Sequence, residues 1–161
     1  MGRRDPLPAD ALSGIHVLVV DDDRDARDLF QTVLEYSGAL VTTAPSATEA
    51  VRALQRLLPD VIVTDISMPE RDGYWLIEQI RRLPPERGGA TPTVAVTAHG
   101  VRAAEQKAGQ AFQAYLGKPI DPWQLCRVVA SLAGRITGGD GCDGDGPGAD
   151  RPGGEGDGLR T

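Results

Sequence analysis

The chain has 161 residues, 40% of them hydrophobic, and a formal net charge of −6. This length suits one globular domain and leaves no room for a second catalytic domain. The acidic balance without a basic cluster argues against a nucleic-acid surface. No apolar stretch approaches the roughly 20 residues that cross a bilayer, and residues 1–13 lack the apolar centre of a secretory signal. We therefore expect a cytoplasmic protein that binds neither nucleic acid nor membrane.

Composition divides the chain into three parts. Residues 1–14 contain prolines and a glycine without periodicity, which predicts a short flexible leader. Residues 15–136 are expected to form the folded domain. Residues 137–161 carry six acidic residues and two arginines among many glycines, and such a segment buries too little apolar surface to order itself. A disordered acidic tail is therefore expected. Cys126 and Cys142 are interpreted as free thiols, because their spacing fits neither a metal site nor a disulfide framework.

Strand-like and helix-like segments alternate along the domain. Short apolar runs predict five strands, at residues 15–20, 40–43, 61–64, 93–96 and 114–117. Helical spacing and end signals predict five helices, around residues 25–37, 46–58, 75–80, 101–111 and 121–132. Ser46 with Glu49 forms a capping box, Asp121 precedes Pro122 as an N-cap, and Gly109 interrupts the fourth helix. This alternation predicts an α/β fold with a doubly wound five-stranded parallel sheet and helices on both faces.

Charged and polar residues follow four of the predicted strands. Asp21 and Asp22 come directly after the first strand, Asp65 after the third, Thr97 after the fourth and Lys118 after the fifth. Open parallel sheets bind their ligands beyond the carboxyl ends of the strands, so these residues are expected to converge. Adjacent buried carboxylates repel one another, and a hard cation such as Mg²⁺ would compensate that repulsion. The chemistry indicated is phosphoryl handling with a metal.

Four motifs at these strand ends resemble those of a known family, the receiver domain of bacterial two-component response regulators (CheY-like). The resemblance spans residues 14–135, and the 83–93 loop is most similar in style to receivers of hybrid sensor kinases. The motifs are Val19-Val20-Asp21-Asp22-Asp23, Asp65-Ile66-Ser67-Met68-Pro69 with Asp72-Gly73, Val96-Thr97-Ala98 and Tyr115-Leu116-Gly117-Lys118-Pro119.

By this resemblance Asp65 is the phosphoacceptor, whose carboxylate attacks the phosphoryl group of a phosphohistidine. The resemblance implies a Mg²⁺ cofactor held by Asp21, Asp22, Asp65 and the backbone carbonyl of Ser67, with Asp22 binding directly and Asp21 largely through water. The metal would neutralise charge as the phosphoryl group approaches. Mg²⁺ is thus the expected cofactor.

The resemblance also assigns the remaining positions. Lys118 would pair with Asp65 and then with a phosphate oxygen, and Thr97 would donate its hydroxyl to another phosphate oxygen. Tyr115 occupies the switch position, although a half-buried aromatic that packs without switching remains an alternative. The resemblance gives structural roles to Pro69, Gly73 and Pro119. It also implies that the Lys118–Pro119 peptide bond is cis.

Two departures from the family pattern concern the region near these residues. The family commonly has Gly where this chain has Ala111, with Gly109 nearby, so the turn there is expected to shift. His99, two residues beyond Thr97, is either a solvent-facing residue without a role or an influence on the access of water to the acyl phosphate.

The function implied is a single-domain response regulator, a monomer or weak dimer. It would accept a phosphoryl group from a sensor histidine kinase or a histidine phosphotransfer protein and signal to a protein target. It is not expected to be an enzyme beyond assisting its own phosphorylation and dephosphorylation.

Two alternatives remain open. A small phosphatase of the haloacid dehalogenase type would use Asp21 as nucleophile and Asp23 as general acid, but it would leave Asp65 without a purpose. A receiver-like binding module that is never phosphorylated would keep the same residues, since geometry decides reactivity.

Overall fold

The computed structural model describes residues 10–134. Its strands are β1 (His16–Val20), β2 (Leu40–Ala44), β3 (Val61–Asp65), β4 (Thr93–Thr97) and β5 (Ala114–Gly117). Its helices are α1 (Arg24–Tyr36), α2 (Ala47–Leu57), α3 (Gly73–Arg82), α4 (Val101–Ala108) and α5 (Pro122–Leu132), with 3₁₀ turns η1 (Pro85–Arg87) and η2 (Gly109–Ala111). Within this part of the chain, no helix has both the length and the apolar character that crossing a membrane requires.

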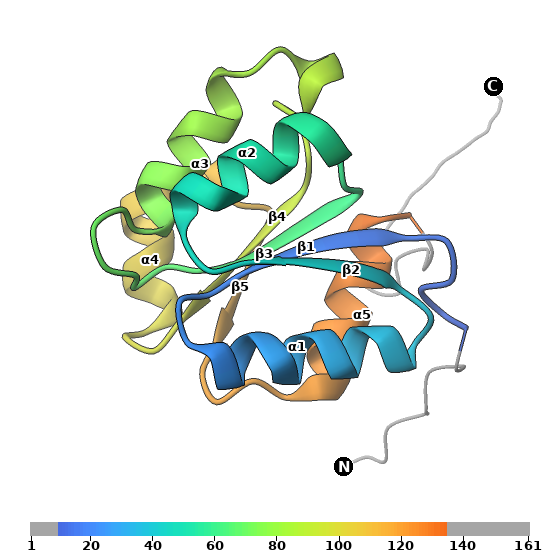
Figure 1. Cartoon of the computed structure of the whole chain (residues 1–161). Helices are drawn as coiled ribbons and strands as arrows, with labels where there is room; N and C mark the ends of the chain where they lie inside the picture. Colours follow the sequence, from blue (N-terminus) through green and yellow to red (C-terminus); the bar gives the residue numbers. More distant parts are fainter. Residues whose placement is uncertain (1–9, 135–161) are drawn as a thin grey trace, which may run out of the picture.

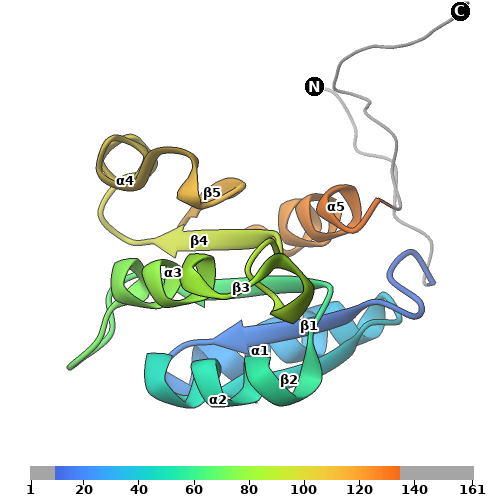
Figure 2. The same ribbon diagram turned by 90° about the horizontal axis from the view of Figure 1, so that it is seen from above.

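All five strands pair in parallel, in the order β2-β1-β3-β4-β5. The predicted doubly wound five-stranded parallel sheet is therefore confirmed. The chain runs from β1 outward to β2 and then returns past β1 to β3, so the direction of winding reverses at β1. In Figure 2, β1 and β4 lie on either side of β3 and point the same way. The carboxyl ends of β1 and β3 consequently flank a topological switch point, where such sheets bind ligands.

Helices cover both faces of the sheet because alternate strand residues point to opposite sides. Val17 and Val19 of β1 pack in a cluster with residues of α1 and α5. Leu18 and Val20 of the same strand pack in a second cluster with residues of α2, α3 and α4. Figure 1 shows α1 below the sheet and α2 and α3 above it. The two apolar clusters hold the sheet rigid between helical layers, and so they fix the positions of the strand ends.

The packed domain begins before residue 15. Leu12 is fully buried in the apolar cluster that the sheet forms with α1 and α5. Its N–H donates to the carbonyl of Ser37 at 2.8 Å. Residues 10–14 therefore differ from the flexible leader expected there, because one large apolar side chain is enough to anchor this turn. Residues 1–9 and 135–161, which include most of the predicted leader, the whole predicted tail and Cys142, lie outside the described residues.

The fourth helix is shorter than predicted. It ends at Ala108, and Gly109 takes a positive φ of 59° before η2 begins. The positive φ thus lies at Gly109, two residues before Ala111, where glycine carries no Cβ penalty. The caps predicted at Ser46 and Asp121 are both present, since each side chain accepts a backbone N–H of its helix.

Candidate functional site

Four strand ends bring the predicted site residues to one edge of the sheet. Asp21 directly follows β1, Asp65 is the last residue of β3, Thr97 is the last of β4 and Lys118 directly follows β5. The parallel register aligns these ends, since Val20 pairs with Thr64, the residue before Asp65. Asp21, Asp65 and Thr97 are at most 4% exposed. The predicted convergence of these residues is present in the structure.

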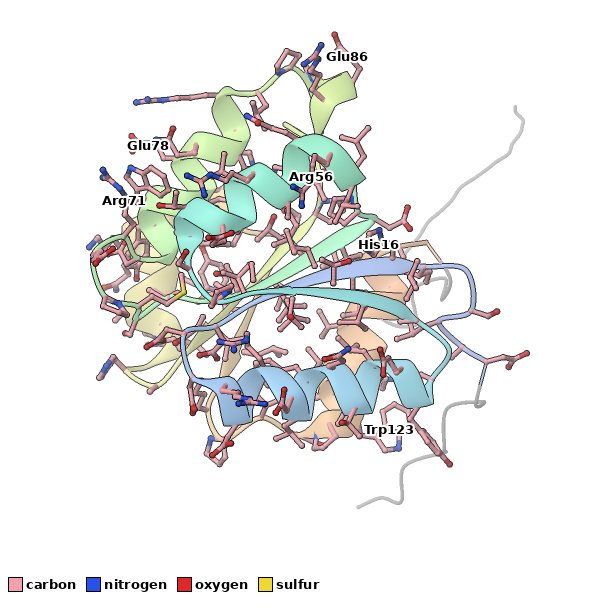
Figure 3. All side chains as sticks on the ribbon, in the orientation of Figure 1. His16, Arg56, Arg71, Glu78, Glu86 and Trp123 are labelled. Carbon is pink, nitrogen blue, oxygen red and sulfur yellow. The ribbon has the colours of Figure 1, made fainter. Side chains whose placement is uncertain are left out.

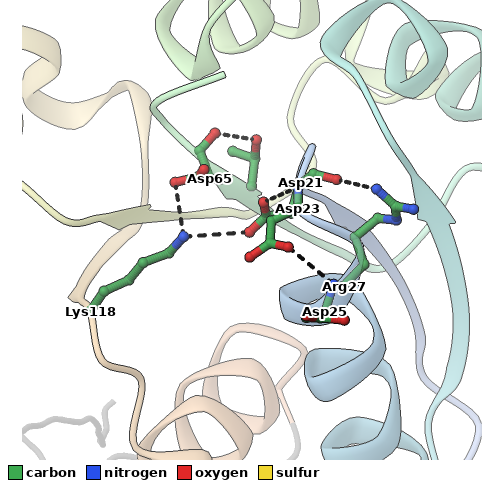
Figure 4. A network of polar contacts seen from close by, with 7 residues as sticks. Asp21, Asp23, Asp25, Arg27, Asp65 and Lys118 are labelled. Atoms are coloured by element: carbon green, nitrogen blue, oxygen red, sulfur yellow. Dashed lines mark hydrogen bonds and ion pairs between the residues drawn. The ribbon is translucent and has the colours of Figure 1, made fainter. Parts of the chain in front are cut away.

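Lys118 lies between two buried carboxylates. Its Nζ is 3.6 Å from Oδ2 of Asp21 and 3.6 Å from Oδ1 of Asp65, as the dashed lines in Figure 4 show. The lysine side chain is 29% exposed, so its ammonium group is partly shielded from water. Because attraction between charges is stronger at a shielded position than in bulk water, this lysine holds both carboxylates in place.

The donor set at this edge fits a hard divalent cation. Carboxylate oxygens of Asp21, Asp22 and Asp65 all lie within 4.8 Å of one another. Asp21 Oδ2 is buried, and within the described residues it has no hydrogen-bond donor. The ammonium group of Lys118 lies 3.6 Å from this oxygen, beyond hydrogen-bond distance. A buried acceptor without a hydrogen bond is costly, and carboxylate oxygens are the ligands that Mg²⁺ uses in proteins. These three residues therefore match the requirements of a Mg²⁺ site.

Burial also raises the pKa of two of these carboxyl groups. For Asp65, burial is the largest cause and the charge of Asp21 raises the pKa further, while Lys118 and the backbone N–H of Ser67 lower it. For Asp21, burial again raises the pKa most, and the backbone N–H of Asp23 and the charge of Lys118 oppose this effect. Without a cation, the site therefore holds its negative charge at a cost that a bound cation would reduce.

Hydrogen bonds fix the backbone on which the carboxylates stand. Arg27 donates from Nη1 to the carbonyl of Asp21 at 2.8 Å, and the N–H of Asp23 donates to Oδ1 of Asp21 at 2.9 Å. Thr64 donates its hydroxyl to the carbonyl of Asp65 at 2.9 Å. Figure 4 shows Arg27 reaching back from α1 toward Asp21. The sequence alone did not predict this role for Arg27, because an arginine in the first turns of an amphipathic helix is usually an exposed residue without a structural role.

Thr97 presents its hydroxyl beside the loop that leads into α4. Its Oγ1 accepts a hydrogen bond from the backbone N–H of His99 at 3.0 Å, which leaves the hydroxyl hydrogen available as a donor. His99 itself is exposed. Thr97 is therefore linked to the start of α4.

Tyr115 lies apart from the carboxylates, at the other end of α4. Its hydroxyl donates to the carbonyl of Gly109 at 2.6 Å. Its ring meets Phe112 edge to face, with ring centroids 5.5 Å apart, and Phe112 in turn meets Tyr74 of α3 at 6.5 Å. The half-buried tyrosine thus connects β5 with the end of α4, and both the switching and the simple packing interpretations fit this position.

The three predicted structural residues border the site. The Lys118–Pro119 peptide bond is cis, as predicted. Gly73 is the first residue of α3, and its N–H donates to the carbonyl of Ile66 at 2.8 Å. A Cβ at Gly73 would lie 2.9 Å from the carbonyl oxygen of Asp65 and 2.8 Å from the Cα of Ile66, so only glycine fits without a backbone shift. Pro69 lies in the exposed turn before α3, where its carbonyl accepts the N–H of Arg71.

Comparison with known proteins gives a consistent result. The sequence profile of the response regulator receiver domain matches residues 17–130. An uncharacterised 14.6 kDa protein of Leptolyngbya boryana is 46% identical over 119 residues, which cover 73% of this chain and 89% of that protein. The response regulator Rre1 of Synechocystis is 37% identical, with 75% of this chain and 52% of Rre1 covered. The sensor protein GacS of Pseudomonas syringae is 38% identical, and the match covers 73% of this chain but only 13% of GacS.

Solved structures of receiver domains have the same fold. The Francisella response regulator 1452 receiver domain superposes with a TM-score of 0.68 at 28% identity, covering 76% of this chain and 98% of that one. The receiver domain of the sensor histidine kinase PA1611 from Pseudomonas aeruginosa gives a TM-score of 0.67 at 30% identity, with coverage of 76% and 99%. In that structure a magnesium ion is coordinated in the active-site cleft.

Proposed function

Since this chain belongs to the response regulator receiver domain family, we propose that it accepts a phosphoryl group on Asp65 and signals through contacts with another protein. The donor would be a sensor histidine kinase or a histidine phosphotransfer protein. The observation that carries this proposal is the environment of Asp65, a nearly buried carboxylate 3.6 Å from the ammonium group of Lys118. One of its oxygens lies within 4.8 Å of one oxygen of Asp21 and one of Asp22.

In the proposed reaction, a carboxylate oxygen of Asp65 attacks the phosphorus of a phosphohistidine. The new O–P bond forms as the N–P bond breaks, and the electron pair of that bond stays on the imidazole nitrogen, which takes a proton from solvent. Lys118 orients Asp65 beforehand and afterwards neutralises charge on a phosphoryl oxygen. Thr97 donates its hydroxyl to a second phosphoryl oxygen. These fixed charges and dipoles lower the barrier because they need no reorganisation during the transfer.

Asp21, Asp22 and Asp65 would hold Mg²⁺ in this reaction, together with the backbone carbonyl of Ser67. When bound, the cation supplies the positive charge that lets an anionic phosphoryl group approach three carboxylates. The buried Oδ2 of Asp21, which lacks a donor among residues 10–134, supports this assignment.

The position of Asp23 argues against the phosphatase alternative. That reaction needs Asp23 as a general acid, but Asp23 is exposed and caps α1, where its carboxylate accepts the N–H of Asp25 at 3.1 Å. It also leaves the buried Asp65 without a role. We therefore propose a phosphoacceptor and not an enzyme that turns over free phosphate esters.

Chemical trapping of the acyl phosphate tests this proposal. The protein is incubated with acetyl phosphate and Mg²⁺ and then treated with borohydride, which reduces an aspartyl phosphate to homoserine. Peptide mass analysis should locate the reduced residue at Asp65. Reduction at Asp21 would support the phosphatase interpretation, and an unmodified protein would support a binding module that is never phosphorylated.

Mg²⁺ is expected to stabilise the protein against heat. A ligand that binds only the folded state adds roughly 1.4 kcal/mol when its free concentration is about ten times Kd, which raises the Tm of a domain of this size by several degrees. Differential scanning calorimetry with Mg²⁺ and with EDTA measures this shift. Asp22→Asn should abolish the shift, whereas Asp25→Asn, which removes a nearby exposed acid outside the carboxylate cluster, should preserve it. A shift that survives Asp22→Asn would contradict the ligand assignment.

The stability of the metal-free protein is expected to fall as the pH rises. Burial raises the pKa of Asp21 and Asp65 above the ordinary value of 3.8, so between the unfolded and folded pKa values the folded state binds more protons. This contribution to stability is fully present below the unfolded pKa and is lost as the pH rises through the folded pKa. Urea denaturation in EDTA, from about pH 4 to about pH 8, measures it. Asp21→Asn should flatten the decline, and an equal slope in that variant would argue against buried charge as its cause.

A further inference from the structure

A groove of about 630 Å³ lies between α3 and α4, away from the carboxylate cluster. From α3 it is lined by Tyr74, Trp75 and Ile77, and from α4 by Lys107 and Ala108. Tyr74, Trp75 and Ala108 are only partly buried, so apolar surface is open to a ligand here. Arg71 lies over the ring of Trp75, with its Cζ 4.6 Å from the ring centroid. Figure 3 shows Arg71 and Glu78 on the same side of the molecule, directed away from the sheet.

The groove is positively charged although the chain as a whole carries −6. Three cations line it, Arg81, Arg82 and Lys107, against one acid, Glu78. Glu78 lies 3.7 Å from Arg82, where both side chains are largely exposed, so this pair is weak. The local excess of positive charge favours an acidic ligand.

Two of these cations lack an acidic partner. Arg81 donates only to neutral oxygens, namely the carbonyls of Gly89, Thr91 and Ala111 and the amide oxygen of Gln113. Lys107 lies over the face of Tyr74, with its Nζ 4.2 Å from the ring centroid. Among the described residues, no carboxylate oxygen is within 4.0 Å of either cation. The donors of Arg81 are used by these protein oxygens, so it contributes positive charge to the groove. The ammonium group of Lys107 is available to a carboxylate from another molecule.

Both walls of the groove are tied to the residues that the proposed reaction uses. The α3 wall begins at Gly73, which packs directly against the backbone of Asp65. The α4 wall begins just after His99, whose N–H is held by the hydroxyl oxygen of Thr97. A phosphoryl group on Asp65 that draws this hydroxyl toward itself would weaken the hydrogen bond to His99 and thereby alter the α4 wall.

The far end of the same wall is tied to Tyr115. Its hydroxyl bonds to the carbonyl of Gly109, the residue that ends α4, and its ring contacts Phe112, which contacts Tyr74 in the groove. Movement of Tyr115 therefore changes both the end of α4 and the aromatic lining. The groove is thus connected to the backbone beside Asp65 and Thr97 at one end and to Tyr115 at the other.

We propose that the groove between α3 and α4 binds an acidic segment of a partner protein, one that carries carboxylates next to an aliphatic or aromatic side chain, and that phosphorylation of Asp65 changes the affinity. The carboxylates would pair with Arg82 and Lys107, and the apolar side chain would pack on Trp75 and Ile77. This inference rests on the proposed function, because it needs Asp65 to be phosphorylated.

Fluorescence anisotropy of a labelled probe peptide tests the proposal on the full chain. The probe has about ten residues, with four glutamates around one leucine, and in extended form it reaches roughly 33 Å. A second probe has lysines in place of the glutamates. With beryllium fluoride and Mg²⁺, which together mimic the phosphorylated carboxylate, the affinity for the acidic probe should change by about tenfold or more relative to the untreated protein. The lysine probe should bind in neither state.

Two variants locate the binding. Arg82→Glu combined with Lys107→Glu should weaken binding of the acidic probe by about tenfold or more, since it replaces attraction with repulsion. Arg56→Glu, which changes an exposed arginine on α2 outside the groove (Figure 3), should leave it unchanged. Borohydride trapping at Asp65 in the Arg82→Glu, Lys107→Glu variant tests phosphorylation of Asp65 independently of peptide binding in the groove. If Asp65 is labelled while probe binding is unaltered by the variant or by beryllium fluoride, the inference fails and the proposed function stands.

The other possible occupants give different results. If the six acids at residues 137–161 occupied the groove, replacing them with their amides in the full chain would raise the affinity for the probe by about tenfold or more. A second copy of the chain would give probe binding that falls as the protein concentration rises. Either result, or the absence of any acidic-probe binding, would overturn the proposal of a partner segment.

Discussion

Asp65→Asn is expected to slow phosphoryl incorporation from acetyl phosphate by three orders of magnitude or more, the scale on which removal of a nucleophile acts. The amide is a far weaker nucleophile than the carboxylate, and the substitution also removes one of the two carboxylates that pair with Lys118. Radiolabel incorporation in saturating Mg²⁺ measures the rate. Residual labelling at the wild-type rate would contradict the assignment of Asp65.

The same variant should remain folded. Asparagine has nearly the shape of aspartate, and it removes a buried charge whose pKa burial has raised, so in EDTA the free energy of unfolding should not decrease. Ser67→Ala serves as a matched control, since it changes a side chain two residues away and keeps the backbone groups assigned to the site. It should therefore be labelled like the wild type.

Lys118→Met is expected to slow incorporation by about 10²- to 10³-fold, the cost of removing one preorganised charge from a reaction that develops negative charge. In the wild type the ammonium group is 3.6 Å from both Asp21 and Asp65. Methionine keeps most of the length of the side chain and removes the charge. The measurement is the rate of labelling by acetyl phosphate at saturating Mg²⁺, so that metal affinity does not limit the result.

Lys107→Met provides the control for this substitution. Lys107 is an exposed lysine on α4 that lies over Tyr74 and outside the carboxylate cluster, so its loss should leave the labelling rate unchanged. Equal rates for the wild type and Lys118→Met would show that the lysine only maintains structure. A second measurement distinguishes an electrostatic role of Lys118 from a purely structural one. Without Lys118, the pKa of Asp65 should rise further, because this lysine lowers it in the wild type.

The sheet and the carboxylate cluster were predictable from sequence because both depend on short-range patterns. Apolar runs mark buried strands, and in a parallel sheet the residue after each run lies at the same edge. Asp21, Asp65 and Lys118 could therefore be placed together before their contacts were known. The side-chain distances among them, and the donorless Oδ2 of Asp21, required the structure.

Features that depend on one side chain or on distant pairs were not predictable in this way. Leu12 extends the packed domain, although the prolines around it suggested a flexible leader. Arg27 bonds to a carbonyl six residues earlier, a contact that helical spacing does not mark. The α4 helix ends at Ala108, next to the predicted interruption at Gly109, but the hydrogen bond from Tyr115 to the carbonyl of Gly109 is a tertiary contact that the sequence does not mark.

The groove between α3 and α4 belongs to the same category. Arg81 looks like an ordinary basic residue at a helix end, where the dipole favours it. Its bonds to Ala111 and Gly89 join segments that are 30 and 8 residues away. Only the folded chain brings these carbonyls around one guanidinium group and leaves its charge without a carboxylate partner.

The most direct test of the central claim is the intact mass of the protein after incubation with acetyl phosphate, with Mg²⁺ or with excess EDTA, for the wild type and Asp65→Asn. We predict a gain of one phosphoryl group that requires both Mg²⁺ and Asp65. The same gain in EDTA or in Asp65→Asn, or no gain in a folded wild-type protein with Mg²⁺, would contradict the account.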